Sequence, residues 1–251
     1  MPQYGLIGRK LGHSFSQTYF TQKFSQLHLD QHRYELFELD SPAALPALIA
    51  AHPELRGLNV TVPYKELIWT YLDEVAPSAQ RVGAVNVIEF RTDGRLVGHN
   101  TDYIGFRESV RRFFPLRGEV ARALVLGTGG AAKAVEVGLR ELGISYWLVS
   151  RDPLRDGLTY DDLTPELLAG HPLIINATPL GTYPDIEQCP PLPYSAIGEA
   201  HYLYDLIYNP TETLFLRRGR EAGAQIKNGF EMLCLQAEEA WAIWEGKTVN
   251  S

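Results

Sequence analysis

The stretch NVTVPYK, residues 59–65, gathers an amide, a hydroxyl and an amine within a few positions. In an extended strand Asn59 and Thr61 face one way and the valines between and after them face the other. The proline that follows ends the strand, and Lys65 is expected in the first turn of a helix. This strand-to-helix corner could therefore orient a polar substrate and handle a proton.

Lys65 is a candidate acceptor for the proton of a substrate hydroxyl. A lysine with the ordinary pKa of about 10.4 is almost wholly protonated at neutral pH, so it acts as a base only if its surroundings or a proton relay help. Asp102, within GHNTDYIGF (98–106), could hold the amine in place. The alternative is that each residue is an ordinary solvated charge.

A glycine-rich turn, GTGGAA at 127–132, follows an apolar strand and opens a helix. It fits the G-x-G-x-x-A form of the dinucleotide fingerprint, in which small residues allow a tight turn, close approach to a pyrophosphate and helix–strand packing. Unpaired N–H groups at the helix N-terminus would face the phosphates. A tight turn without a ligand is the alternative. If a nicotinamide dinucleotide binds, hydride transfer would accompany the proton transfer predicted above.

The end of the second strand of this unit bears on cofactor choice. NAD sites usually have an acidic residue there, whereas this chain has Ser150, Arg151 and Asp152, with Arg155 further on. An arginine fork suits a 2'-phosphate, so NADP is favoured over NAD. The alternative is that Arg151 is a solvated surface residue, and Asp152 could either orient the arginine or repel the phosphate.

Composition narrows the class of protein. A chain of 251 residues that is 45% hydrophobic and 21% charged can bury a full core, and a net charge of −7 argues against a nucleic-acid partner. Two cysteines are too few for a disulfide framework or a zinc site, and no metal is expected. No signal peptide or membrane-spanning run is evident. We expect a soluble, cytoplasmic protein that acts on a small molecule.

Short apolar runs alternate with helical patterns, which predicts an α/β protein with mostly parallel sheets. The Asp93-Gly94 pair suits a hairpin turn, and regular strand–helix alternation begins near residue 102. We expect two domains: residues 1–102 plus 231–251 form an α/β substrate and catalytic domain with a mixed sheet, and residues 103–230 form a Rossmann-like dinucleotide-binding domain. The predicted strands are residues 4–8, 33–39, 58–62, 84–90, 95–99, 123–127, 146–150, 173–178 and 202–208.

Several motifs together resemble those of the shikimate dehydrogenase family. They extend over the whole chain: GHSFS (12–16), NVTVPYK (59–65), GAVN (83–86), GHNTDYIGF (98–106), GTGGAA (127–132), NATPLG (176–181), DLIYNP (205–210) and NGFEMLCLQA (228–237). The resemblance implies an oxidoreductase that reversibly reduces 3-dehydroshikimate to shikimate with NADP, in aromatic amino acid (chorismate) biosynthesis.

The resemblance also implies roles for individual residues. Lys65 and Asp102 would form the catalytic pair. Polar groups expected to bind shikimate are Ser14, Ser16, Asn59, Thr61, Asn86, Tyr208 and Gln236. Residues expected at the cofactor are Gly127, Thr128, Gly129, Gly130, Ala131, Ala132, Ser150, Arg151, Arg155, Thr178 and Gly229. The family's Asn-Arg-Thr phosphate loop is Ser-Arg-Asp here, which leaves cofactor preference open.

Some of these residues have a second interpretation. Ser14 and Ser16 are two apart, so in an extended segment both hydroxyls face the same way, but Ser16 could instead cap the helix that follows. Gln236 could be a helix-surface residue. Within enzymes the alternative is a quinate or dual quinate/shikimate dehydrogenase that uses NAD or NADP. Outside enzymes it is a shikimate-binding regulatory module. The oligomeric state stays open between a monomer and a homodimer.

Overall fold

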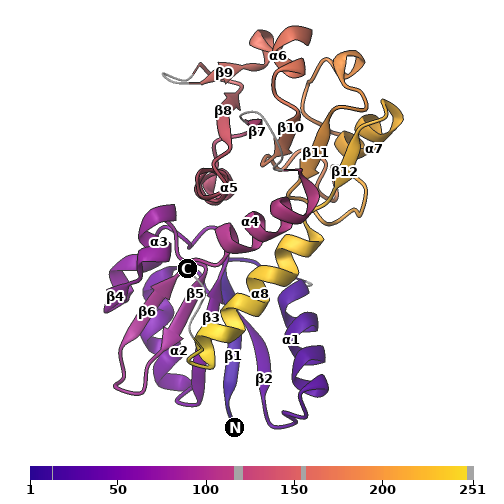
Figure 1. Cartoon of the computed structure of the whole chain (residues 1–251). Coiled ribbons are helices and arrows are strands. Elements are labelled where there is room, and N and C mark those ends of the chain that lie inside the picture. Colours follow the sequence, from indigo (N-terminus) through magenta and orange to yellow (C-terminus); the bar gives the residue numbers. More distant parts are fainter. Residues whose placement is uncertain (13, 116–120, 154–156, 248–251) are drawn as a thin grey trace. The chain divides into compact units, whose positions relative to one another are not determined.

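The computed structural model describes residues 1–12, 14–115, 121–153 and 157–247, and the chain divides into two compact units (Figure 1). Unit 1 comprises Met1–Thr101 and Gln236–Ser251, and unit 2 comprises Asp102–Leu235. The sequence-based boundaries lay after residue 102 and before residue 231, whereas Asp102 and residues 231–235 fall in unit 2. Within the described ranges no helix is both long and apolar enough to cross a membrane.

The sheet of unit 1 is mixed, with strands in the order β2-β1-β3-β5-β6-β4. β1 runs parallel to β2 and β3, whereas β5 is antiparallel to β3 and β6. The expected hairpin turn joins β5 to β6: Gly94 has a φ of +88° and its N–H donates to the Arg91 carbonyl at 3.0 Å. The strands are β1 (Gln3–Gly8), β2 (Arg33–Glu38), β3 (Leu55–Val60), β4 (Glu74–Val75), β5 (Val87–Phe90) and β6 (Leu96–His99).

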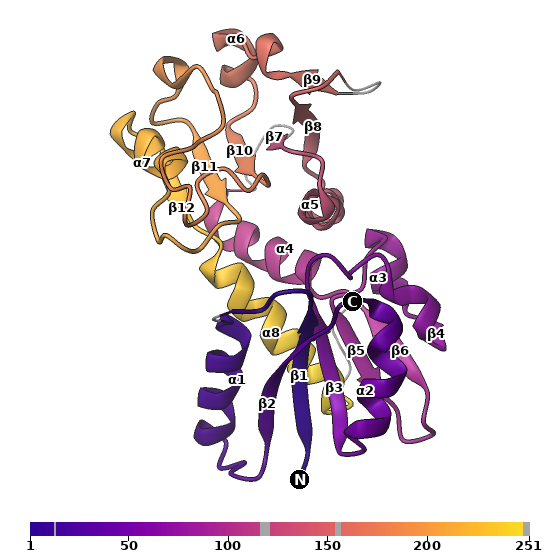
Figure 2. The ribbon, with the colours of Figure 1, turned by 180° about the vertical axis from the view of Figure 1, so that it is seen from behind.

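Helices cover both faces of this sheet because its central strands are apolar on both sides. On β1, Tyr4 and Leu6 pack with residues of α1 and α8, while Ile7 packs on the opposite face with Leu45 of α2. Figures 1 and 2, seen from opposite sides, show α8 and α2 on the two faces. The helices that belong wholly or partly to this unit are α1 (Phe15–Gln26), α2 (Leu45–Ala51), α3 (Pro77–Val82) and α8 (Phe230–Trp244).

The sheet of unit 2 is wholly parallel and reads β9-β8-β7-β10-β11-β12 from one edge. In chain order this is 3-2-1-4-5-6, the order of doubly wound dinucleotide-binding sheets. The order reverses between β7 and β10, so the crevice that such folds use for ligands lies at the carboxyl ends of these two strands. The strands are β7 (Arg122–Leu126), β8 (Ser145–Ser150), β9 (Leu158–Thr159), β10 (Leu173–Asn176), β11 (Tyr202–Asp205) and β12 (Gln225–Lys227).

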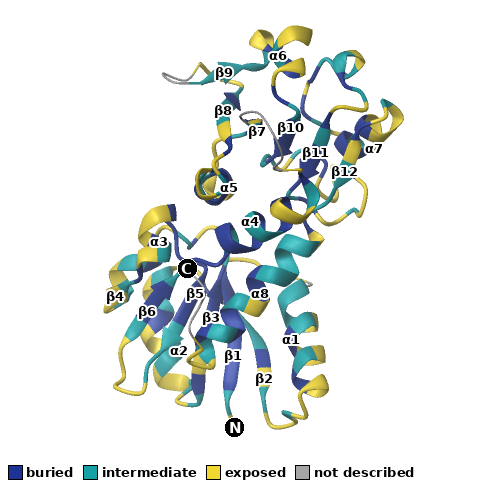
Figure 3. Cartoon of the chain, viewed as in Figure 1, coloured by how far each residue is buried: buried dark blue, intermediate teal, exposed yellow. Residues whose placement is uncertain are grey.

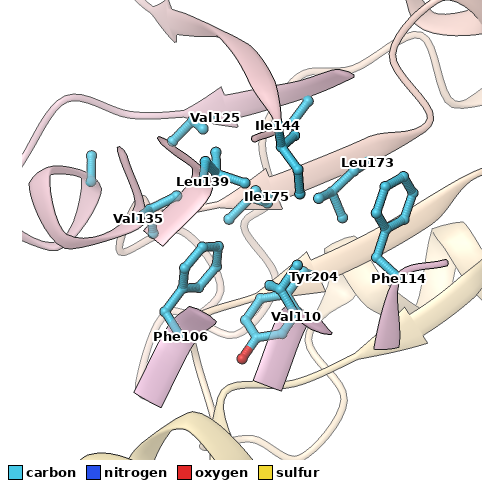
Figure 4. Packing of buried hydrophobic residues seen from close by; sticks show 12 residues of the cluster. Phe106, Val110, Phe114, Val125, Val135, Leu139, Ile144, Leu173, Ile175 and Tyr204 are labelled. Atoms are coloured by element: carbon cyan, nitrogen blue, oxygen red, sulfur yellow. The ribbon is translucent and has the colours of Figure 1, made fainter. Parts of the chain in front are cut away.

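Two apolar clusters sandwich this second sheet. One face packs against α4 (Asp102–Phe113) and α5 (Gly130–Glu141), and the other against α6 (Pro165–Ala169) and α7 (Leu214–Glu221). Figure 4 shows Phe106 and Val110 of α4 facing Ile175 and Tyr204 of the sheet. β7, β10 and β11 are accordingly buried over most of their length (Figure 3). The observed α/β fold confirms the predicted class.

The strand predictions fail where strands are short or the pattern is misleading. β4, β9 and β12 are two or three residues long and carry no periodic signal. β3 begins at Leu55 and ends at Val60, not at Val62. Val62 is 72% exposed, because the chain leaves the sheet before reaching it.

Candidate active site

The corner that carries Lys65 is built by backbone bonds and one buried ring. Thr61 N–H donates to the Ile7 carbonyl at 2.9 Å, and Val85 N–H donates to the Lys65 carbonyl at 2.7 Å. Tyr64 is fully buried, and its hydroxyl donates to the Leu39 carbonyl. Lys65 lies in a turn between β3 and a short 3₁₀ helix, Ile68–Tyr71, and not in the first helical turn that the sequence predicted.

Asn59 belongs to a buried polar network in unit 1. The Tyr34 hydroxyl donates to Asn59 Oδ1 at 2.7 Å, and Asn59 Nδ2 donates to the Asn86 carbonyl at 3.3 Å. Burial raises the pKa of Tyr34 far above its ordinary value, and a hydrogen bond with Ser16 opposes this rise. Tyr34 thus connects two predicted substrate residues, Ser16 and Asn59. It was missed because a tyrosine in an apolar strand carries no local sign of such a role.

The network continues through Asn86, Thr101 and Gln236. Thr101 N–H donates to Asn86 Oδ1 at 2.8 Å, and Asn86 Nδ2 donates to Thr101 Oγ1 at 3.0 Å and to Gln236 Oε1 at 3.4 Å. Asn86 and Gln236 were predicted as separate substrate residues, and the fold brings them together across 150 positions. Gln236 is buried, so the helix-surface interpretation is wrong. Thr101 was overlooked, although it immediately precedes Asp102.

The two serines do not share the extended segment assumed from sequence. α1 begins at Phe15, so Ser14 is its N-cap residue, with extended φ and ψ of −94° and 126°, while Ser16 lies inside the helix. The Ser14 side chain makes no capping bond. The suggestion that Ser16 caps the helix is therefore wrong. Both side chains are half-buried.

Asp102 and Tyr208 lie in unit 2. Asp102 is the first residue of α4 and directly follows Thr101 of unit 1. Tyr208 lies in the loop after β11 and is 39% exposed, and partial burial raises the pKa of its hydroxyl. The pairing of Lys65 with Asp102 stays a prediction.

Close backbone packing explains why residue 229 is glycine, a reason that the sequence did not reveal. A Cβ at this position would lie 2.1 Å from the Leu206 carbonyl oxygen, and the Gly229 N–H donates to the Ile207 carbonyl at 3.1 Å. The close approach that requires glycine is thus already explained by the loop after β11. Its contact with the cofactor stays a prediction.

The glycine-rich turn leaves β7 and enters α5 at the switch point. Gly127 has a φ of +101°, and a Cβ there would lie 3.0 Å from Thr178 Cγ2. Gly129, the N-cap of α5, has a φ of −75° that any residue could adopt, and no atom of the described chain lies within 4 Å of its would-be Cβ. The backbone conformation therefore requires glycine at 127, whereas neither conformation nor packing within the described chain requires it at 129. Open space beside an exposed helix N-terminus suits an anionic ligand.

A pocket of about 330 Å³ lies beside this turn, at the carboxyl ends of β7, β8 and β10. It contains the predicted Ser150, Arg151 and Thr178, as well as Asp152 and a tyrosine, Tyr160, that the sequence reading missed. Arg155 lies outside the described residues. The residues that line the pocket are Gly127, Thr128, Gly129, Val149, Ser150, Arg151, Asp152, Tyr160, Ala177, Thr178, Pro179 and Leu180.

The other predicted residues of the turn differ in their burial. Gly130 and Ala131 are exposed at the start of α5, whereas Ala132 is fully buried against the sheet. Ala132 therefore serves helix–strand packing, as the fingerprint predicts for its last small residue. The exposed residues of the turn offer backbone N–H groups to a ligand.

A buried carboxylate, Asp205, hydrogen-bonds to the end of β10 and to the loop that follows β11. Asp205 Oδ1 accepts from Asn176 Nδ2 at 3.1 Å and from Ile207 N–H at 3.0 Å, and Oδ2 accepts from the Thr213 hydroxyl at 2.6 Å. Asn176 Oδ1 in turn accepts from the Thr178 hydroxyl at 2.6 Å. Burial raises the pKa of Asp205 to about 6, although these hydrogen bonds oppose the rise. The loops after β10 and β11 are thus tied together.

A Rossmann-type sheet with a fingerprint turn, joined to an α/β unit that contains a buried polar network, defines the class of two-domain nicotinamide-dependent dehydrogenases. A family model described as the shikimate dehydrogenase substrate binding domain matches residues 6–88. A "Shikimate dehydrogenase (NADP(+))" of Clostridium beijerinckii is 38% identical over 98% of this chain and 92% of its own. The chain therefore belongs to the shikimate dehydrogenase family.

Solved structures agree with this assignment. Shikimate dehydrogenase 1 from Peptoclostridium difficile has a TM-score of 0.84 and 36% identity, and covers 100% of this chain and 94% of its own. The Thermus thermophilus enzyme in complex with NADP(H) and shikimate has a TM-score of 0.85 and 34% identity, over 98% and 94%. A quinate dehydrogenase from Corynebacterium glutamicum in complex with NAD reaches 0.84 at 26% identity, over 98% and 94%.

Proposed function

We propose that this protein is an NADP-dependent shikimate dehydrogenase, which reversibly reduces 3-dehydroshikimate to shikimate in aromatic amino acid biosynthesis. The observation that carries the proposal is the pocket at the switch point of the unit 2 sheet, where open space beside Gly129 meets the guanidinium of Arg151. Family membership supplies the substrate class.

The pocket residues fit a dinucleotide with a 2'-phosphate. The exposed N-terminus of α5 offers N–H groups to a pyrophosphate, and Arg151 offers a cation at the end of the second strand. The bound nicotinamide supplies the site that accepts or donates the hydride. NADP is thus favoured over NAD, although Asp152, a carboxylate among the described residues that line the pocket, opposes this preference.

Lys65 and Asp102 handle the proton of the reacting hydroxyl in this proposal. The turn that follows β3 fixes the Lys65 backbone, so the flexible side chain extends from a rigid base. Asp102, at the start of α4, orients the amine in this proposal. Together they take up the hydroxyl proton when shikimate is oxidised and return it in the reverse direction.

The buried network of unit 1 orients the substrate. Asn59, Asn86 and Gln236 are held by one another and by Tyr34 and Thr101, so their polar atoms are preorganised. A substrate hydroxyl that meets such groups gains specificity, because a buried polar group left unpaired costs about 1 to 3 kcal/mol. Ser14, Ser16 and Thr61 complete the proposed set, with Tyr208 contributed by unit 2.

The proposal is tested by mixing the purified protein with shikimate or quinate, each with NADP⁺ or NAD⁺, and following formation of the reduced nicotinamide. We expect the highest kcat/KM for shikimate with NADP⁺. A higher value for quinate would make the protein a quinate or dual dehydrogenase. If no pair reduces the cofactor, while isothermal titration shows that shikimate binds, the regulatory-module interpretation replaces the enzyme.

We also propose that the protein acts in the cytoplasm and binds no nucleic acid. The net charge of −7 and the two cysteines support this, since nucleic-acid binders concentrate positive charge and oxidising compartments favour more disulfides. Light scattering on the purified protein would decide between the monomer and the homodimer.

A further inference from the structure

The connection between β8 and β9 is unusually short for parallel neighbours. Adjacent parallel strands are normally joined by a crossover of a dozen or more residues, most often a helix. Here residues 151–157 alone separate the two strands, yet β9 pairs with the end of β8 in the register Val149↔Leu158 and Ser150↔Thr159. The pairing ends at Ser150 and Thr159, directly before Arg151 and Tyr160, and these two residues line the same pocket.

Local bonds fix the place of Tyr160. It opens a 3₁₀ turn, Tyr160–Asp162, that begins with a capping box between Thr159 and Asp162. The Thr159 N–H and hydroxyl both donate to Asp162 Oδ2, at 2.7 and 2.8 Å. Leu163, directly after the turn, is 5% exposed and anchors it in the apolar cluster on one face of the sheet. The hydrogen bonds of Thr159 before Tyr160 and the buried side chain of Leu163 after it thus fix the backbone of the tyrosine beside the pocket.

The Tyr160 side chain faces the same pocket as the arginine. Tyr160 is half-buried and lines the pocket with Ser150, Arg151 and Asp152. Burial raises the pKa of its hydroxyl, while the positive charge of Arg151 opposes the rise. The hydroxyl therefore remains a protonated donor at neutral pH, in the pocket that Arg151 also lines.

We propose that Tyr160 is a second ligand of the NADP 2'-phosphate, its hydroxyl donating to the phosphate beside the guanidinium of Arg151, and that it contributes to the preference for NADP over NAD. The inference rests on the proposed cofactor. In dinucleotide-binding sheets the adenosine ribose lies just past the second strand, which is where β8 ends here. A neutral donor next to Arg151 would also offset the repulsion of the phosphate by Asp152.

The test compares Tyr160→Phe, which keeps the ring and removes only the hydroxyl, with the unaltered protein. Isothermal titration with 2',5'-ADP and 5'-ADP measures the adenosine subsite without catalysis, and NADP⁺ and NAD⁺ are titrated alongside. We expect Tyr160→Phe to raise the Kd of 2',5'-ADP and NADP⁺ about 10- to 150-fold, the range for a hydrogen bond to a charged group. The Kd of 5'-ADP and NAD⁺ should stay within about twofold. Tyr183→Phe, at a tyrosine that is 71% exposed and outside the pocket lining, is the matched control.

The outcomes separate this inference from the proposed cofactor. Equal weakening of phosphorylated and unphosphorylated ligands, or no change in either, overturns the role of Tyr160 while the unaltered protein still prefers NADP⁺. Failure of the unaltered protein to prefer 2',5'-ADP over 5'-ADP overturns the cofactor assignment, and with it this inference. Non-additive losses when Tyr160→Phe is combined with Arg151→Ala would show that both residues act on one phosphate.

Discussion

At the scale of single residues, Lys65 combines a rigid backbone with a flexible amine. The Lys65 carbonyl accepts a hydrogen bond from the Val85 N–H, and the ring of the neighbouring residue Tyr64 is fully buried. Replacing Lys65 by alanine or Asp102 by asparagine should leave the fold intact and lower kcat by about 10²- to 10⁴-fold, the usual contribution of a positioned acid–base group. Steady-state kinetics with NADP⁺ titrations would show unchanged cofactor affinity. A variant with near-normal kcat would remove that residue from the chemistry.

Arg151 governs cofactor choice at the same scale. Its guanidinium is exposed at the pocket, so its removal should affect the ligand rather than the fold. Arg151→Ala should weaken NADP⁺ binding about 10- to 150-fold, because a hydrogen bond to a charged group is worth about 1.5 to 3 kcal/mol. NAD⁺, which lacks the phosphate, should lose little. Equal losses for both cofactors would instead mark Arg151 as structural.

At the scale of elements, two glycines are predicted to serve different purposes: Gly129, between β7 and α5, serves cofactor binding, and Gly229, between β12 and α8, serves folding. A Cβ at Gly129 would meet open space, whereas one at Gly229 would clash with the Leu206 carbonyl. Gly129→Ala should therefore keep nearly the wild-type melting temperature and raise the KM for NADP⁺ at least tenfold. Gly229→Ala should lower the free energy of unfolding by about 1 to 3 kcal/mol, the usual range for overpacking. The reverse pattern would mean that Gly129 serves the fold and not the ligand.

The loops after β10 and β11 are joined by Asp205, whose pKa is raised from 3.8 to about 6. Between these values the folded protein binds more protons at this group than the unfolded chain, so its contribution to stability grows as the pH falls from 7 to 4 and is lost as the pH rises through 6. Asp205→Asn removes this dependence. In urea unfolding, the stability of the wild type relative to Asp205→Asn should increase by roughly 1 to 3 kcal/mol from pH 7 to pH 4. A difference that does not vary with pH would contradict the raised pKa.

At the scale of the whole molecule, the last segment of the chain completes the core of unit 1. Trp241 of α8 is 5% exposed and packs against Tyr4 and Phe24 with ring centroids 5.5 Å apart in each case. Trp241→Ala should lower the free energy of unfolding by about 3 to 5 kcal/mol. Trp147→Ala, at a tryptophan that is 46% exposed on β8, is the matched control and should lose far less. Similar losses in both would show that α8 does not determine the stability of unit 1.

Local sequence patterns made much of the fold predictable. The turn at Gly127 lies between a strand and a helix, as its spacing predicted, because its conformation depends on the residues directly around it. The longer strands reveal themselves by their apolar runs for the same reason. The two- and three-residue strands were missed, and strand ends were often wrong: both ends of β3 differ from the prediction, β5 begins later, and β10 and β11 end earlier. Such boundaries depend on pairing with distant strands.

The tertiary structure decided how the polar residues are combined. Tyr34 meets Asn59 across 25 positions and Asn86 meets Gln236 across 150, contacts that no local pattern encodes. Tyr160 comes to the pocket because β9 pairs with β8 directly, a consequence of strand register rather than of residue type. Residue types and local spacing thus determine which chemistry is available to this chain. Long-range packing determines which of its side chains meet.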